Sequence, residues 1–264
     1  MVALSVAGSD SGGGAGIQMD LRVLQRMGVL ATTAITAVTA QNLNGVQHVA
    51  GVGPESLAAQ LAAVLSGFDV AAIKTGMLWS APLIEVLATA LNDTDVPLVI
   101  DPVMIATSGA RLLDPAAVRA YKLLWPRAAL VTPNLDEATE LLGVPIDPSR
   151  MTDAAERLAD KLQCAVLLKG GHLEGPPCDV LATGSETASW SHARIESVNT
   201  HGSGCLLSAA ITARLALGDP LLDACEVALS FTHDALARGA EQGAPYLAAV
   251  ELASSERAHL RRVL

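Results

Sequence analysis

The heptapeptide NTHGSGC at residues 199–205 holds the group in this sequence best placed for chemistry. Two glycines flank Ser203, and Cys205 opens a run of apolar residues at helical spacing. The pattern predicts a glycine-rich turn leading into a helix, with Ser203 as its N-cap. A helix start offers N–H groups that suit a phosphate, and the same field would lower the pKa of the Cys205 thiol. An ordinary turn, with Cys205 as a small buried hydrophobic residue, explains the heptapeptide equally well.

Further polar side chains come directly after segments with the composition of strands: Asp10, Gln41, Asp101, Asn134 and Lys169. In open α/β sheets, ligands bind beyond the carboxyl ends of the strands. We therefore expect these five side chains to converge along one sheet edge. This convergence is the strongest indication of a ligand site that the residues themselves give.

The individual roles of these residues stay open at this stage. Gln41 has the donor and the acceptor that a heterocycle edge requires, but a solvated turn amide is also expected there. Lys169, beside two glycines, could meet a nucleotide phosphate or remain in solvent. Asn134 and Glu137 are three residues apart, which suits either a capping box or a magnesium site with oxygen ligands.

The glycine-rich segment GSDSGGGAG at residues 8–16 lies between a predicted strand and a predicted helix. This context is typical of a loop that approaches a phosphate or nucleotide. The spacing matches neither of the common glycine-rich nucleotide fingerprints. We interpret the segment as a loop that lines a ligand.

Strand-like and helical patterns alternate along the chain. Strands are predicted at 2–7, 31–39, 70–74, 97–100, 128–131 and 165–169, helices at 17–27, 54–65, 82–91, 115–124, 135–142, 152–163, 205–217 and 221–237, and a hairpin at 179–182 and 187–192. This alternation predicts an α/β fold, a three-layer α/β/α sandwich with a central, mostly parallel sheet. No linker or repeat interrupts it, so residues 1–264 are expected to form a single domain.

Composition narrows the class of protein. Hydrophobic residues make up 51% of the 264 residues and aromatic residues 3%, which suits helices packed on a buried sheet. The net charge of −10 argues against nucleic-acid partners and anionic membrane surfaces. No apolar run is long enough to span a membrane, and no signal peptide is recognised. The four cysteines lack metal-binding spacing, which favours reduced thiols in a cytoplasmic protein.

Seven motifs together resemble the hydroxymethylpyrimidine/phosphomethylpyrimidine kinase family of thiamine biosynthesis, a family of the ribokinase-like superfamily. They stand at residues 8–18 (GSDSGGGAGIQ), 39–42 (TAQN), 74–77 (KTGM), 101–104 (DPVM), 132–135 (TPNL), 169–172 (KGGH) and 199–205. The resemblance covers residues 2–236. Its fold, a central sheet flanked by helices, agrees with the alternation described above.

The resemblance implies roles for particular residues. The aminopyrimidine would be held by Gln41 and the backbone around Gly8, in a pocket also lined by Asp20, Met77 and Val103. The anion hole would be the turn of Gly202, Ser203 and Gly204, with Cys205 accepting the proton of the substrate hydroxyl. The nucleotide side would contain Lys169, Asn134 and Thr200, and magnesium would lie near Asp101 and Glu137.

The implied activity is an ATP- and Mg²⁺-dependent phosphorylation of hydroxymethylpyrimidine and then of its monophosphate, by a homodimer. Ser203 stands where the family more often has threonine, which keeps the hydroxyl. Residues 239–246 differ from the family's usual glycine- and histidine-rich segment, so the contribution of this tail is open.

Two alternatives remain at this stage. A pyridoxal kinase could share the cysteine-bearing turn, although the amide of Gln41 favours a pyrimidine with its exocyclic amine. A non-catalytic small-molecule sensor or carrier could keep the fold. The presence of Cys205, Asp101 and the glycine-rich turn argues against this second alternative.

Overall fold

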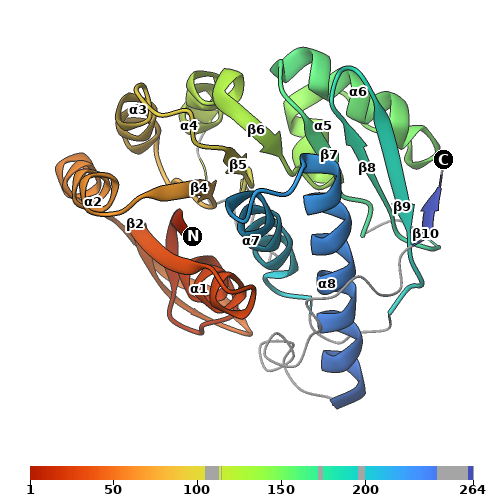
Figure 1. The fold of residues 1–264 in the computed structure, drawn as a ribbon, viewed down its shortest axis with the longest axis horizontal. Coiled ribbons are helices and arrows are strands. Elements are labelled where there is room, and N and C mark those ends of the chain that lie inside the picture. Colours follow the sequence, from red (N-terminus) through yellow and green to blue (C-terminus); the bar gives the residue numbers. More distant parts are fainter. Residues whose placement is uncertain (105–112, 114, 172–174, 196–199, 243–260, 264) are drawn as a thin grey trace.

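The computed structural model describes residues 1–104, 113, 115–171, 175–195, 200–242 and 261–263. Within them, one sheet contains ten strands in the order β10-β9-β8-β7-β6-β5-β4-β1-β2-β3. Figure 1 shows this sheet between two layers of helices. The strands are β1 (Val2–Asp10), β2 (Leu30–Asn42), β3 (Gly45–Gly51), β4 (Val70–Thr75), β5 (Leu98–Ile100), β6 (Ala128–Val131), β7 (Val166–Leu168), β8 (Cys178–Ala182), β9 (Thr187–Ser191) and β10 (Arg261–Val263).

The six strands β2, β1, β4, β5, β6 and β7 form the parallel centre of the sheet. Strand β3 extends one side antiparallel to β2, and β8, β9 and β10 extend the other side antiparallel. From β1 the chain continues to β2 and β3 on one side, and it then crosses to β4 and β5 on the other side of β1. Such a switch point leaves a crevice at the carboxyl ends of the parallel strands.

The helices form two layers, each with its own buried cluster. One face of the sheet packs against α1 (Gly16–Arg26), α7 (Ser203–Ala216) and α8 (Leu221–Gln242). The other face packs against α2 (Pro54–Gly67), α3 (Ala81–Ala90), α4 (Pro115–Ala120), α5 (Leu135–Leu142) and α6 (Met151–Leu162). The three-layer sandwich predicted from the sequence is therefore confirmed.

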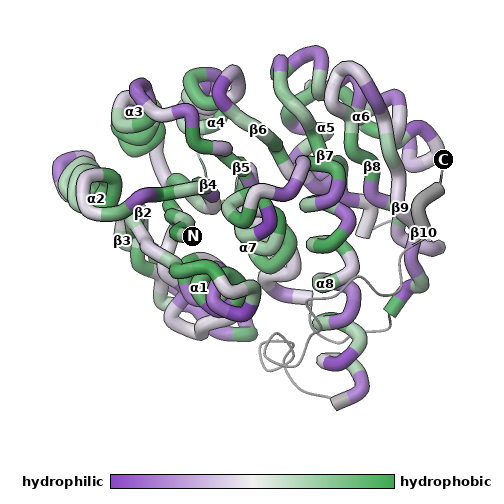
Figure 2. The backbone as a smooth tube through the Cα atoms, viewed as in Figure 1, coloured by the Kyte–Doolittle hydropathy of each residue, from purple (hydrophilic) through white to green (hydrophobic). Residues whose placement is uncertain are grey.

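Side-chain alternation along each strand divides the core between the two layers. In β5, Leu98 and Ile100 join the cluster under α2–α6, whereas Val99 joins the cluster under α1, α7 and α8. Since the central strands are covered on both faces, they are mostly apolar, with buried Lys74 and Thr75 of β4 among the exceptions. Figure 2 shows this in the continuous hydrophobic colouring of β6 and β7.

Several element boundaries differ from the prediction. The helix predicted at 115–124 ends at Ala120 and continues as 3₁₀ turns over Tyr121–Leu123 and Trp125–Arg127. Pro126 prevents the α-helix from continuing beyond these turns, because proline has no N–H for a helical hydrogen bond. The edge strands β3 and β10 were not predicted. For β3, the Asn44-Gly45 pair was an available hairpin signal.

Candidate functional site

A cavity of about 420 Å³ opens where the parallel strands end. Its walls come from the ends of β1 and β2 and from the segments that follow β4, β5, β6 and β7, together with the start of α7 and part of α8. Fourteen of the residues implicated by the sequence line it: Gly8, Asp10, Gln41, Met77, Asp101, Val103, Asn134, Glu137, Lys169, Thr200, Gly202, Ser203, Gly204 and Cys205. The expected convergence at one sheet edge is therefore observed. Asn199 and His172, which belong to two of the quoted motifs, lie outside the described residues.

Asp20 is the exception among the residues expected in the pocket wall, because it does not line this cavity. Its side chain is fully buried between α1 and the sheet and does not line the cavity. Its carboxylate accepts hydrogen bonds from Lys74 Nζ at 2.6 Å and from Ser5 Oγ at 2.5 Å. Asp20 lies on the inward face of α1, among buried residues such as Met19 and Val23, so the helix directs it toward the sheet. The Asp20 carboxylate therefore compensates the positive charge of the buried Lys74 side chain.

The glycine-rich loop is organised by Asp10, which ends β1. The Asp10 carboxylate accepts the N–H groups of Gly12, Gly14 and Ala15 at 2.8–2.9 Å. Gly16 begins α1 with φ of 55°, and a side chain there would collide with the carbonyl group of Gly8. The loop therefore packs too closely on β1 for any residue larger than glycine at position 16.

The turn before α7 differs in one detail from the expectation. Gly202 is the N-cap, in the left-handed region with φ of 76°, and Ser203 is the first residue of the helix, so the predicted Ser203 cap is wrong. Glycine adopts this conformation at little cost. The turn remains closed because Ser203 N–H donates to the carbonyl of Thr200 at 3.1 Å. The residues of the first turn of α7 border the cavity, as an anion site requires.

Cys205 is only partly accessible, at the start of α7. Burial raises its pKa to about 11, and the nearby carboxylates of Asp20 and Asp101 act in the same direction. Lys74 and a hydrogen bond from Gly16 N–H lower the pKa but do not offset the burial. The expectation that the helix start would leave this thiol with a lowered pKa is therefore wrong.

An ion pair lies on the side of the pocket formed by β5 and β7. Lys169 Nζ is 3.1 Å from Asp101 Oδ1, and Ser208 Oγ donates to Asp101 Oδ2 at 3.3 Å. A Cβ on Gly204 would lie 3.3 Å from Lys169 Nζ, so glycine there lets the start of α7 approach the pair closely. This places a cation beside the first turn of the helix.

Asn134 and Glu137 form a capping box at the start of α5. Glu137 N–H donates to Asn134 Oδ1 at 2.9 Å, and Asn134 N–H donates to Glu137 Oε2 at 2.8 Å. Burial raises the pKa of Glu137 to about 7, against the opposing effect of Lys169. The capping role considered from the sequence is confirmed. Within the described ranges, no group of three or more His, Cys, Asp and Glu side chains is arranged to hold a metal ion.

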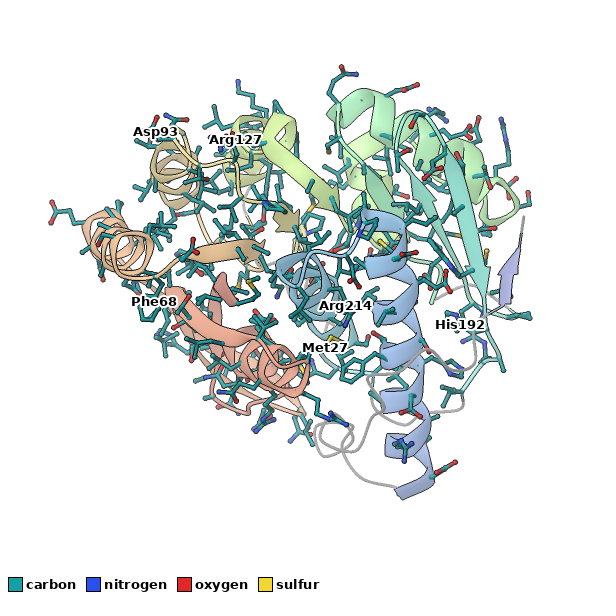
Figure 3. All side chains as sticks on the ribbon, viewed as in Figure 1. Met27, Phe68, Asp93, Arg127, His192 and Arg214 are labelled. Atoms are coloured by element: carbon teal, nitrogen blue, oxygen red, sulfur yellow. The ribbon has the colours of Figure 1, made fainter. Side chains whose placement is uncertain are left out.

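Some pocket residues carried no functional prediction. His201 lies inside the cysteine-bearing turn, and its Nε2 is 3.0 Å from Gln41 Nε2. The pocket is also lined by Asp179, by His192 and by His233 of α8, and the ring centroids of the two histidines are 5.2 Å apart. His192 is labelled in Figure 3. Burial, and then His233, lower the pKa of His192 to about 4. His201 could have been found from its place in the motif, whereas the distant pair has no local sequence signal.

A family model described as phosphomethylpyrimidine kinase matches residues 10–248. The chain belongs to this family. A hydroxymethylpyrimidine/phosphomethylpyrimidine kinase of Rhizobium meliloti is 46% identical over 89% of this chain and 90% of its own length. A bifunctional thiamine biosynthesis protein of Geobacter sulfurreducens is 48% identical over 84% of this chain and 46% of its own length. The family resemblance identified from the motifs is therefore confirmed.

Solved structures give the same fold. A Bacillus subtilis pyridoxal kinase in complex with ADP has a TM-score of 0.82 and 36% identity, over 89% of this chain and 91% of its own. A phosphomethylpyrimidine kinase of Clostridium difficile has a TM-score of 0.76 and 37% identity, over 86% and 96%. The protein is thus a ribokinase-like phosphotransferase, a kinase of the thiamine pathway. Within the described residues, no helix is long and apolar enough to cross a membrane.

Proposed function

We propose that this protein uses ATP to phosphorylate hydroxymethylpyrimidine and then phosphorylates the resulting monophosphate to the diphosphate. The observation that carries the proposal is the single cavity in which Gln41 and Cys205 lie together with Lys169. The cavity thereby combines an amide that can pair with a polar heterocycle edge, a helix start that can bind an anion, and a cation that can bind a phosphate. Phosphoryl transfer depends mainly on alignment and on stabilisation of charge, and this set of groups supplies both.

The pyrimidine would bind at the β1–β2 side of the cavity. Gln41 would pair with its polar edge, and the backbone of Gly8 together with Met77 and Val103 would enclose the ring. Gly8 suits this role because a side chain at this position would collide with the end of the Met77 side chain. The wall of the pocket is therefore already closely packed there. The hydroxymethyl group would then point toward Cys205.

The phosphates would bind between Lys169 and the turn of Gly202, Ser203 and Gly204, with Asn134 and Thr200 on the nucleotide side. Lys169 would leave Asp101 in part to meet a phosphate oxygen, and the N–H groups of the turn would stabilise the charge on the transferred group. Cys205 would accept the proton of the substrate hydroxyl. Because the pKa of Cys205 is raised to about 11, this proton transfer should become faster with rising pH.

The carboxylates of Asp101 and Glu137 are oxygen donors of the kind that Mg²⁺ prefers, and both border the cavity. Mg²⁺ in proteins is commonly held by one or two carboxylates together with substrate phosphates, and this arrangement fits a site without three protein ligands. We therefore propose that both residues hold the magnesium of Mg-ATP. Bound there, the ion would neutralise charge on the transferred phosphate. The buried carboxyl of Glu137 would be ionised more readily beside a divalent cation.

Three further expectations are kept as proposals. Residues 1–264 form one kinase domain, supported by the continuous sheet. The protein acts in the cytoplasm, supported by four free cysteines. It forms a homodimer, which rests on the resemblance to the family and would be tested by light scattering of the purified protein.

A pyridoxal kinase remains the second candidate, because several of the structural neighbours are pyridoxal kinases, among them one from Staphylococcus aureus with a TM-score of 0.81 and 30% identity. Steady-state kinetics with both acceptors decide between the two. We expect kcat/KM for hydroxymethylpyrimidine to exceed that for pyridoxal at least tenfold. The reverse preference would overturn the proposal, and a failure to consume ATP with either acceptor would favour a non-catalytic binding protein.

A further inference from the structure

A ring nitrogen of His201 is approached by two side chains with opposite hydrogen-bonding character. His201 Nε2 lies 3.0 Å from Gln41 Nε2 and 3.3 Å from Asp10 Oδ2. An amide NH₂ group only donates hydrogen bonds, and a carboxylate only accepts them. One imidazole nitrogen either donates or accepts. Both contacts therefore cannot be hydrogen bonds with the Gln41 amide in this orientation.

Asp10 indicates which role the nitrogen has. Burial alone would raise the pKa of Asp10, but the pKa is lowered overall. Independently of His201, the carboxylate accepts the N–H groups of Gly12, Gly14 and Ala15, and such hydrogen bonds favour the charged form. The carboxylate is therefore ionised, and an imidazole lone pair directed at it would be repelled. His201 Nε2 must carry a proton that it shares with Asp10.

Thr39 gives an independent reason that concerns the Gln41 amide. Thr39 Oγ1 lies 3.0 Å from the carbonyl oxygen of Ser9 and 3.4 Å from Gln41 Oε1. A hydroxyl has one hydrogen to donate, and the Ser9 carbonyl can only accept it. Thr39 Oγ1 then offers a lone pair to Gln41, so the amide NH₂ of Gln41 belongs on the Thr39 side.

A half-turn of the Gln41 amide removes both conflicts, because its oxygen and nitrogen have nearly the same shape. His201 Nε2–H then donates to Gln41 Oε1 and Asp10, the Gln41 NH₂ donates to Thr39 Oγ1, and Thr39 donates to Ser9. We propose that His201 is a positioning residue that fixes this orientation of Gln41 and thereby selects the ligand. This proposal rests on the proposed function, and it specifies which polar edge of a heterocyclic ligand Gln41 would select.

In this orientation one N–H of Gln41 and one lone pair of its Oε1 remain for a ligand. They match a heterocycle that presents a ring-nitrogen acceptor beside an exocyclic amine donor. A ligand with a phenolic oxygen in place of the amine would place an acceptor or a rotatable hydroxyl against Oε1. The amide orientation therefore contributes to the discrimination between an aminopyrimidine and a hydroxypyridine.

Packing holds the His201 ring in this position. A Cβ on Gly14 would lie 2.6 Å from His201 Cδ2, so the imidazole rests directly on the glycine-rich loop. Ser11 Oγ exchanges hydrogen bonds of 2.8 and 2.9 Å with the backbone of Gln41. Arg22 of α1 donates to Gly13 O of the same loop at 3.0 Å. The loop, the end of β2 and the turn before α7 are thus joined around His201.

The first test compares His201→Leu with His201→Gln, whose amide N–H can replace the Nε2–H donor. The exposed His48 of β3 supplies the control, His48→Leu. We expect His201→Leu to raise KM for hydroxymethylpyrimidine roughly tenfold and to affect kcat less, because the part-buried hydrogen bond that orients Gln41 is lost. His201→Gln should restore most of the affinity, and His48→Leu should match the wild type. Equal losses in both His201 variants would overturn the proposal.

The second test shows whether His201 acts through Gln41. In a double-mutant cycle, His201→Leu should have little further effect on KM when Gln41→Leu is already present. Additive effects of the two substitutions would contradict a shared role. This cycle needs hydroxymethylpyrimidine as a substrate, so it also depends on the proposed function.

A spectroscopic measurement on the wild-type protein is independent of any activity. Nitrogen-15 NMR, with His201 assigned by the peak that disappears in His201→Gln, reports the tautomer of the neutral ring. We expect the form protonated at Nε2. The form protonated at Nδ1 would refute the orientation even if the kinase reaction is found. Conversely, the Nε2–H form without pyrimidine kinase activity would leave the hydrogen-bond chain intact and overturn the proposed function alone.

Discussion

Lys74 Nζ lies 2.6 Å from Asp20 Oδ1, and neither side chain is exposed to solvent. Removing one partner of such a buried ion pair leaves the other charge buried without compensation, whereas removing both charges is better tolerated. We expect Lys74→Met to lower the free energy of unfolding by about 3–5 kcal/mol and the Lys74→Met/Asp20→Asn pair to cost clearly less. Urea denaturation of the three proteins measures this. Equal stability of the single and double variants would contradict the pairing.

The Lys74 cation also lowers the pKa of Cys205, against the effect of burial, and so favours the thiolate. In the double variant, which lacks both charges, alkylation of Cys205 should change less than in Lys74→Met alone. The comparison requires Cys164, Cys178 and Cys225 to be replaced first, so that one thiol is followed.

Asp179 provides a prediction about pH. Its side chain is buried and accepts Gly170 N–H at 2.8 Å, and burial raises its pKa from 3.8 to about 6. Between these values the folded state holds a proton that the unfolded state has lost, so stability falls as pH rises from about 4 to 6 and is level above it.

Relative to Asp179→Asn, which keeps the acceptor oxygen, the wild type should lose on the order of 3 kcal/mol over this range. Other titrating groups, such as the nearby His192, contribute similarly to the free energy of unfolding of both proteins. Their contributions therefore largely cancel in the difference between the two. Urea denaturation of both proteins at a series of pH values measures this difference in the free energy of unfolding. A difference that stays constant with pH would show that Asp179 does not titrate in this way.

Cys205→Ala should reduce kcat for hydroxymethylpyrimidine by roughly 10²- to 10⁴-fold, as for other general bases. Because burial raises the thiol pKa to about 11, alkylation of Cys205 should be slow at neutral pH and faster with each increase in pH toward that value. Bound substrate should protect the thiol. Near-normal turnover by correctly folded Cys205→Ala would reduce the turn to an anion site alone.

Cys205→Asp separates the two phosphorylation steps. A carboxylate can take the hydroxyl proton, so part of the first phosphorylation should return. The second acceptor is already anionic, and a fixed negative charge beside it should slow that step further. Rates with the alcohol and with the monophosphate, measured in parallel, test this difference. Equal recovery of both steps would contradict the proposed place of Cys205.

Gln41→Leu should raise KM for hydroxymethylpyrimidine at least several-fold, because an unpaired buried polar group costs on the order of 1–3 kcal/mol. The fold should be unaffected, since the Gln41 side chain is only partly buried at the end of β2. Circular dichroism serves as the control for folding. An unchanged KM would remove Gln41 from the substrate pocket.

Much of this site could be predicted from local sequence. Polar residues that follow buried strands must meet at one edge of a parallel sheet, so the grouping of Gln41, Asp101 and Lys169 was a consequence of alternation alone. The burial of Asp20 was less accessible, because its partner Lys74 lies 54 residues away in the chain. The raised pKa of Cys205 likewise depends on charges that only the folded chain brings near it.

The edges of the fold were the least predictable part. Strand β3 has little hydrophobic alternation, and its pairing with β2 follows from a short turn at Asn44. His192, which directly follows β9, and His233 of α8 reach the pocket from two segments of the last third of the chain. No spacing within either segment indicates that they meet.

Mass spectrometry of the products formed from hydroxymethylpyrimidine and Mg-ATP tests the proposed activity most directly. We expect a first product with one added phosphoryl group and, on longer incubation, a second product with two. Cys205→Ala supplies the control for both. Unmodified pyrimidine after extended incubation, with pyridoxal phosphorylated under the same conditions, would contradict the account.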